Sequence, residues 1–79
     1  MLFEVHWSNI TGNMLITLNG KQKDLPTPMT LQALVAQSAK APEHVVAELN
    51  GAIIEKARWG TTTVPKNAVI ELVTFVGGG

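Results

Sequence analysis

The chain contains no cysteine among its 79 residues. This absence excludes a disulfide scaffold, a thiolate metal site, an iron–sulfur cluster and a cysteine nucleophile. The two histidines, His6 and His44, are isolated and have no further ligands at metal-site spacing, so both are interpreted as surface residues. The sequence therefore predicts a domain that its apolar core alone stabilises.

An excess of either charge and a long apolar run are also missing. Six Lys and Arg balance six Asp and Glu, so no electrostatic attraction to nucleic acid or an anionic membrane is expected. No apolar run approaches the roughly 18–20 residues of a membrane span, and the first residues lack the plan of a signal peptide. Apolar residues make up 46% of the chain, which is typical of a globular domain. We expect one small, soluble, cytoplasmic domain.

Alternating apolar and polar residues predict a series of short strands. These strands fall at residues 14–18, 21–25, 45–50, 52–54 and 69–76. The pairs Asn19-Gly20 and Asn50-Gly51 predict tight hairpins, because both residue types tolerate a positive φ. Thr30 is the predicted N-cap of a helix over Leu31–Ala39.

The order hairpin, helix, strand, short strand, strand predicts an α+β fold of the β-grasp (ubiquitin-like) class. We expect a mixed sheet of four to five strands with one helix across one face, and a closing strand parallel to the first in the middle of the sheet. The domain is predicted over residues 14–76, with Trp59 closing one end of its core. Residues 1–13 are a predicted N-terminal extension, interpreted as an edge strand, a dimer-forming arm or an early-start segment.

A helix on one face leaves the other face of such a sheet uncovered. If Ile16 faces the helix, the period of two along each strand places a set of apolar side chains on this open face. The set is Leu15, Val46, Val73 and Phe75. We predict that it is a partner-binding patch, since exposed apolar patches commonly mark partner surfaces. Glu48 and Glu71 fall on the same face and are interpreted as solvated or partner-facing charges, not as a general acid and base.

The chain closes on three glycines, Gly77, Gly78 and Gly79, directly after the last apolar strand. Glycine lacks a Cβ, so the three residues make a thin stalk that reaches at most about 10 Å. The tail is either a frayed terminus or cloning scar, or a stalk that delivers the terminal carboxylate into a partner enzyme. Its place on the closing strand of a predicted β-grasp, beside the predicted patch, favours the second interpretation.

Several segments together resemble the ThiS family, the ubiquitin-like sulfur carriers of thiamine biosynthesis. They are LNG at residues 18–20, the turn with Pro26 and Pro28, LQAL at 31–34, VAELNG at 46–51, Trp59 and IELVTFVGGG at 70–79. The resemblance covers Met14 to Gly79 and leaves residues 1–13 unaccounted for. It implies a carrier, a protein co-substrate rather than an enzyme.

In this family the C-terminal glycine carries the chemistry, which by resemblance falls on Gly79. The resemblance implies that a ThiF-type adenylating enzyme activates the Gly79 carboxylate with ATP and magnesium, and that the carrier itself binds no cofactor. Sulfur from a cysteine desulfurase would give a thiocarboxylate, and thiazole synthase (ThiG) would take that sulfur for the thiazole ring. The chain has Lys66-Asn67 where the family usually has an acidic residue, which bears on partner electrostatics.

Other functions stay open at this point. A MoaD-type carrier for molybdopterin, or a carrier for tRNA thiolation, would use the same fold and terminal glycines. The two Asn-Gly pairs and Trp59 favour the thiamine branch. A non-catalytic β-grasp protein-binding module with an inert tail is a further alternative, as is a modifier that forms isopeptide bonds.

Overall fold

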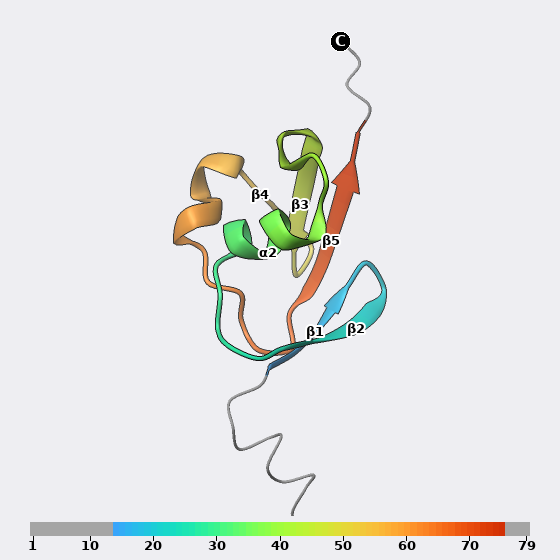
Figure 1. Ribbon diagram of the computed structural model, residues 1–79, viewed down its shortest axis with the longest axis vertical. Helices are drawn as coiled ribbons and strands as arrows, with labels where there is room; N and C mark the ends of the chain where they lie inside the picture. Colours follow the sequence, from blue (N-terminus) through green and yellow to red (C-terminus); the bar gives the residue numbers. More distant parts are fainter. Residues whose placement is uncertain (1–13, 76–79) are drawn as a thin grey trace, which may run out of the picture.

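The computed structural model describes residues 14–75 (Figure 1). The predictions for residues 1–13 and for the tail lie outside the described residues. In chain order the elements are β1 (Met14–Leu18), β2 (Lys21–Leu25), α2 (Leu31–Ser38), η1 (Pro42–His44), β3 (Val45–Leu49), β4 (Ala52–Ile54), η2 (Lys56–Thr61) and β5 (Val69–Thr74), where η1 and η2 are 3-10 helices. Each predicted strand and the predicted helix is present, with small differences at their ends.

The five strands form one mixed sheet in the order β2-β1-β5-β3-β4. Strand β5 lies in the middle, parallel to β1 and antiparallel to β3. Helix α2 lies in front of the sheet in Figure 1, and β5 runs toward the C-terminal end of the chain. This arrangement is the β-grasp fold and confirms the predicted α+β class.

Helix α2 forms because its sequence supplies both a cap and an apolar face. The Thr30 Oγ1 accepts a hydrogen bond from the Ala33 N–H at 3.1 Å, which confirms the predicted N-cap. Leu31, Leu34 and Val35, at i, i+3 and i+4, are buried. The helix ends at Ser38, one residue before the predicted end.

Within residues 14–75, no helix has the length and apolar character needed to cross a membrane.

The core lies between α2 and one face of the sheet. Its buried residues are Ile16, Leu25, Leu31, Leu34, Val35, Val45, Ala47, Trp59, Val64, Ala68 and Ile70. Trp59, on η2, is 4% exposed, and its Nε1–H donates to the Ile54 carbonyl at 3.0 Å. The indole thus fills one end of the core, as predicted, with its polar atom satisfied.

The asparagines of the two hairpin turns also bind the central strand. Asn19 and Asn50 each have a φ of 51°, the left-handed conformation that the Asn-Gly pairs predict. The Asn50 N–H donates to the Val69 carbonyl, and its Oδ1 accepts from the Val69 N–H, both at 2.8 Å. The Asn19 N–H donates to the Ile70 carbonyl at 2.8 Å, and its Oδ1 accepts from the Leu72 N–H at 2.7 Å. Both turns therefore hold β5, and Asn19 supplies an acceptor where β1 has ended.

Candidate functional site

The sheet face that α2 leaves uncovered carries large apolar side chains in contact with solvent. They are Leu15, Val46, Ile53, Val69, Val73 and Phe75, with exposed fractions between 37% and 66%. All four residues of the predicted patch are in this set. Their chain neighbours on the other face, such as Ile16 and Ile70, are at most 1% exposed. The alternation predicted from the sequence thus divides each strand between core and surface.

Three residues of the predicted patch lie next to one another. Val46 and Val73 are direct cross-strand partners of β3 and β5, which places their Cβ atoms about 4.5–5.5 Å apart. Phe75 follows Val73 on the same face, and its N–H donates to the His44 carbonyl at 2.9 Å. The Phe75 and His44 ring centroids are 5.7 Å apart. The patch therefore continues to Phe75, the last described residue before the tail.

Leu15 lies on the same face but at the other end of the sheet. The register pairs Thr17 of β1 with Val69 of β5, and the Leu15 carbonyl accepts a hydrogen bond from the Asn67 N–H at 3.0 Å. This position is roughly 20 Å from Val73 along an extended strand. The finding corrects the expectation that all four residues crowd together, because the period of two fixes the face but not the position along the strand. The role of each residue in partner binding stays a prediction.

Two exposed apolar residues, Ile53 and Val69, were not in the predicted patch. Val69 shares the period-two alternation of Val73 in β5, so the sequence held a signal for it. Ile53 reaches this surface through the pairing of β4 with β3, where it lies opposite Glu48. That pairing depends on register, which local sequence patterns specify weakly for a three-residue strand.

Glu48 and Glu71 are direct cross-strand partners on the open face. Both side chains are half-buried. On this face, the Val46 and Val73 pair is the neighbouring pair along the same two strands. Within residues 14–75, no three His, Cys, Asp or Glu side chains gather as metal ligands would.

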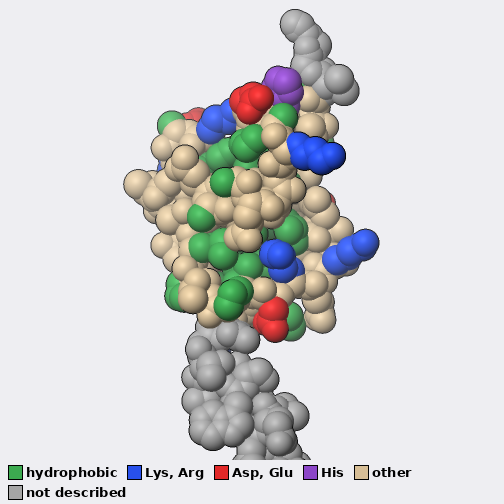
Figure 2. All heavy atoms as spheres, viewed as in Figure 1, with side chains coloured by type: hydrophobic (Ala, Val, Ile, Leu, Met, Phe, Trp, Pro, Cys, Tyr) green, Lys and Arg blue, Asp and Glu red, His purple; other side chains and the backbone are tan. Residues whose placement is uncertain are grey.

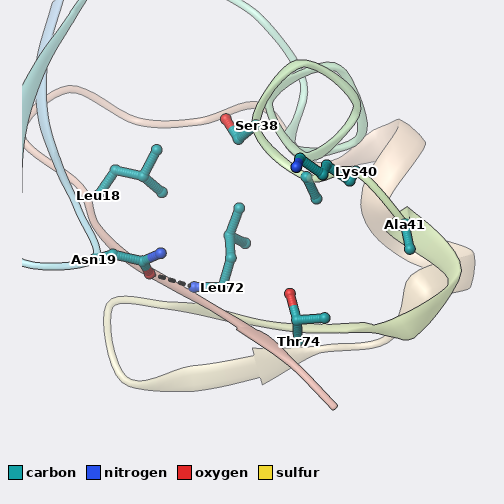
Figure 3. Close-up of a pocket in the computed structure, with 8 residues that line it drawn as sticks. Leu18, Asn19, Ser38, Lys40, Ala41, Leu72 and Thr74 are labelled. Carbon is teal, nitrogen blue, oxygen red and sulfur yellow. Dashed lines mark hydrogen bonds between the residues drawn. The ribbon is translucent and has the colours of Figure 1, made fainter. Parts of the chain in front are cut away.

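A pocket of about 300 Å³ opens on the other side of the sheet, at the C-terminal end of α2 (Figure 3). It is lined by Leu18, Asn19, Ser38, Ala39, Lys40, Ala41, Leu72 and Thr74. The figure shows the Asn19 side chain bound to the Leu72 N–H at one edge, with Ser38 and Lys40 across the pocket. None of the residues that line this pocket belongs to the predicted patch.

Gly79, predicted to carry the chemistry, and the predicted tail residues Gly77 and Gly78 lie outside the described residues. What the structure gives is the strand that precedes them. Strand β5 pairs with β1 at Val69 and Ile70 and with β3 as far as Thr74, and the hairpin asparagines bind its Val69 and Leu72 N–H groups. The tail therefore follows the central strand of the sheet.

A central β5 in a β-grasp sheet with an uncovered apolar face beside it defines a ubiquitin-like domain. Comparison with known proteins gives its family: the ThiS family model matches residues 16–79. The chain therefore belongs to the ThiS family.

Individual relatives agree with this assignment. The crystal structure of a thiamine biosynthesis protein (ThiS) from Geobacter metallireducens is similar at a TM-score of 0.72 and 33% identity, over 84% of this chain and 100% of that one. Thiazole synthases of Magnetococcus marinus and Paramagnetospirillum magneticum are 35% and 29% identical over 66 residues, which is 84% of this chain. The chain spans 20% of the length of these two synthases.

Proposed function

We propose that this chain is a sulfur carrier of thiamine biosynthesis and that Gly79 carries the sulfur as a C-terminal thiocarboxylate. The observation that carries the proposal is the extent of the family match, which runs from residue 16 through Gly79 and so includes the tail. Similarity to the thiamine biosynthesis protein of Geobacter metallireducens supports the same pathway. The chain acts as a protein co-substrate, and its partners supply the catalytic groups.

The proposed chemistry begins at the Gly79 carboxylate. Its oxygen attacks ATP, held with magnesium by a ThiF-type adenylating enzyme, and pyrophosphate leaves. The resulting acyl-adenylate has AMP as a good leaving group, so the terminal sulfur of a persulfide made by a cysteine desulfurase displaces AMP and forms an acyl disulfide. A thiol reductant then cleaves the S–S bond, which leaves the thiocarboxylate on Gly79 and a disulfide as the oxidised product. Gly78 and Gly79 have no Cβ, which leaves the acyl carbon unhindered and lets the backbone enter a narrow channel. ATP and magnesium belong to the adenylating enzyme.

Thiazole synthase is the proposed acceptor of the sulfur. A stretch similar to this chain makes up a fifth of two proteins named thiazole synthase. Joining two domains in one chain raises the effective concentration of each for the other. That arrangement is expected of a carrier and the enzyme that consumes its sulfur.

The contiguous part of the open face is the proposed contact for the adenylating enzyme. Phe75 and Val73 are about half exposed, and Phe75 precedes Gly79 by a stretch that reaches at most about 14 Å. An enzyme that holds Gly79 in its active site therefore lies against this end of the sheet. Burial of exposed apolar side chains there would favour the complex.

The test is pyrophosphate exchange by a ThiF-type enzyme with magnesium and ATP. We expect exchange of labelled pyrophosphate into ATP when the full chain is present, and background exchange with a matched chain that lacks Gly78 and Gly79. Equal exchange with both chains would contradict the proposal.

Complementation distinguishes the thiamine pathway from the molybdopterin pathway. The gene should restore growth to a strain that lacks its thiamine sulfur carrier, and not to one that lacks its molybdopterin carrier.

A further inference from the structure

Glu48 and Glu71 bring two acidic side chains to directly opposing positions on the open face. They are direct partners in the β3–β5 ladder, with Cβ atoms about 4.5–5.5 Å apart. Both side chains are half-buried. Like charges directly opposite one another destabilise a sheet, so this pair opposes the stability of the fold that holds it.

Exposed apolar side chains lie on three sides of the pair, and the fourth side, toward β1, carries the polar Thr17 beside Val69. Val46 and Val73 form the next cross-strand pair on this face, two residues along each strand. Ile53 lies opposite Glu48 on β4, and Val69 precedes Glu71 on the same face of β5. These four residues form what we call the apolar ring: Val46, Ile53, Val69 and Val73, each 37% to 66% exposed.

Basic side chains of the strands do not share this face. The pairing of Lys21 with Leu18 and of Lys23 with Ile16 puts both lysines on the opposite side of β2, whereas Asp24, the partner of Leu15, lies on the open face. Figure 2, viewed as in Figure 1 with α2 in front of the sheet, shows further Lys and Arg side chains on the helix side. Among the strand residues that the structure describes, the open face therefore carries the acidic side chains Asp24, Glu48 and Glu71 and no Lys or Arg.

Docking on the apolar ring would remove water from both carboxylates. Desolvating a carboxylate is costly unless a cation pairs with it. A purely apolar partner surface therefore does not fit. A second copy of the chain, face to face, would set carboxylates against carboxylates and does not fit either. The face fits a surface that is apolar at its edge and cationic at its centre.

We propose that the open face docks on the adenylating enzyme through a guanidinium group that enters the apolar ring and bridges Glu48 and Glu71. This inference rests on the proposed function and adds the chemistry by which the partner is recognised. A guanidinium presents several N–H donors in a planar fork that matches carboxylate oxygens. The apolar ring excludes water from the contact, which strengthens the attraction. The adenylating enzyme is the occupant because the same face continues through Phe75 toward the carboxylate that this enzyme must receive.

The variant E48Q/E71Q tests the proposal in the full-length chain, since glutamine keeps the shape and removes the charge. We expect its dissociation constant for a ThiF-type enzyme, measured by calorimetry, to rise about tenfold or more. The salt dependence of binding should weaken as well. Its Tm should rise by roughly 2–4 °C because a like-charge pair is gone. If E48Q/E71Q binds more weakly although its Tm is higher, the loss of affinity cannot be due to a loss of folding.

The matched control is Asp24→Asn, which removes an acid from the same face outside the apolar ring. Its affinity should stay within about twofold of the unmodified chain. Unchanged affinity and salt dependence in E48Q/E71Q would overturn the inference, as would tight binding by E48K/E71K. If the unmodified chain supports pyrophosphate exchange while E48Q/E71Q binds equally well, this inference fails and the proposed function stands. If the unmodified chain supports no exchange yet E48Q/E71Q binds more weakly, the proposed function fails and the docking contact stands.

Discussion

The two faces of the sheet are built from the same kinds of residue and have different surroundings. Ile70 has no exposed surface, and its neighbour Val69 is 47% exposed. On β3, Ala47 is fully buried and Val46 is 37% exposed. Helix α2 covers one face and leaves the other to solvent. Apolar character alone therefore does not distinguish buried from exposed strand positions, whereas position relative to the helix does.

The largest expected effect lies on the covered face. Ile70→Ala removes a fully buried side chain from the central strand and should lower the free energy of unfolding by about 2–5 kcal/mol. Denaturant unfolding of the two proteins measures the difference. A loss well below this range would show that the covered face is packed more loosely than its burial implies.

Trp59 tests the edge of the covered face. Trp59→Phe removes the Nε1–H that binds the Ile54 carbonyl at 3.0 Å and should lower the free energy of unfolding by about 0.5–1.5 kcal/mol, the usual net contribution of one hydrogen bond. Thermal unfolding provides the measurement. Arg58→Ala, at an exposed neighbour on η2, is the control and should change stability little. Equal losses in the two variants would contradict the role given to the hydrogen bond.

Phe75 and Leu15 lie at opposite ends of the open face, so substitutions at the two positions show which end contacts the adenylating enzyme. Phe75→Asp should weaken binding to the adenylating enzyme about tenfold, or about 1.4 kcal/mol, by placing a charge in the proposed contact. Leu15→Asp makes the same chemical change at the far end of the face and should leave affinity unchanged. Calorimetric titration of both variants is the measurement, with circular dichroism to show that each is folded. Equal weakening by both would show that the contact extends over the whole face.

The smallest expected effect is on folding at the open face. Val69→Ala trims an exposed side chain and should change the free energy of unfolding by less than about 0.5 kcal/mol. Denaturant unfolding of Val69→Ala and Ile70→Ala compares the loss of stability at two adjacent positions of β5, one on each face. A loss as large as that of Ile70→Ala would break the distinction between the two faces.

Local rules predicted most of the fold. The Asn-Gly turns and the Thr30 cap are set by sterics and hydrogen bonds within a few residues, and they occur where the sequence places them. The face of each strand residue follows from the period of two. The sequence also predicted that β5 would lie parallel to β1, because the hairpin, helix and strand order leaves that place in the sheet.

Long-range geometry was harder to predict. The bonds from Asn19 and Asn50 to β5 join residues 53 and 19 positions apart, and nothing local distinguishes them from ordinary turn residues. The place of Leu15 depends on the register of β1 against β5, a non-local pairing. Gly79 could be named because the resemblance supplies its role, and its role stays a proposal.

The central claim is that the sulfur travels on the terminal carboxylate of Gly79. Intact-protein mass spectrometry after incubation with a ThiF-type enzyme, magnesium, ATP and a sulfur source tests it most directly. The account predicts a gain of about 16 Da in the full chain, as sulfur replaces oxygen, and no gain in the chain that lacks Gly78 and Gly79. An unchanged mass beside an active enzyme, or the same gain in the truncated chain, would contradict it.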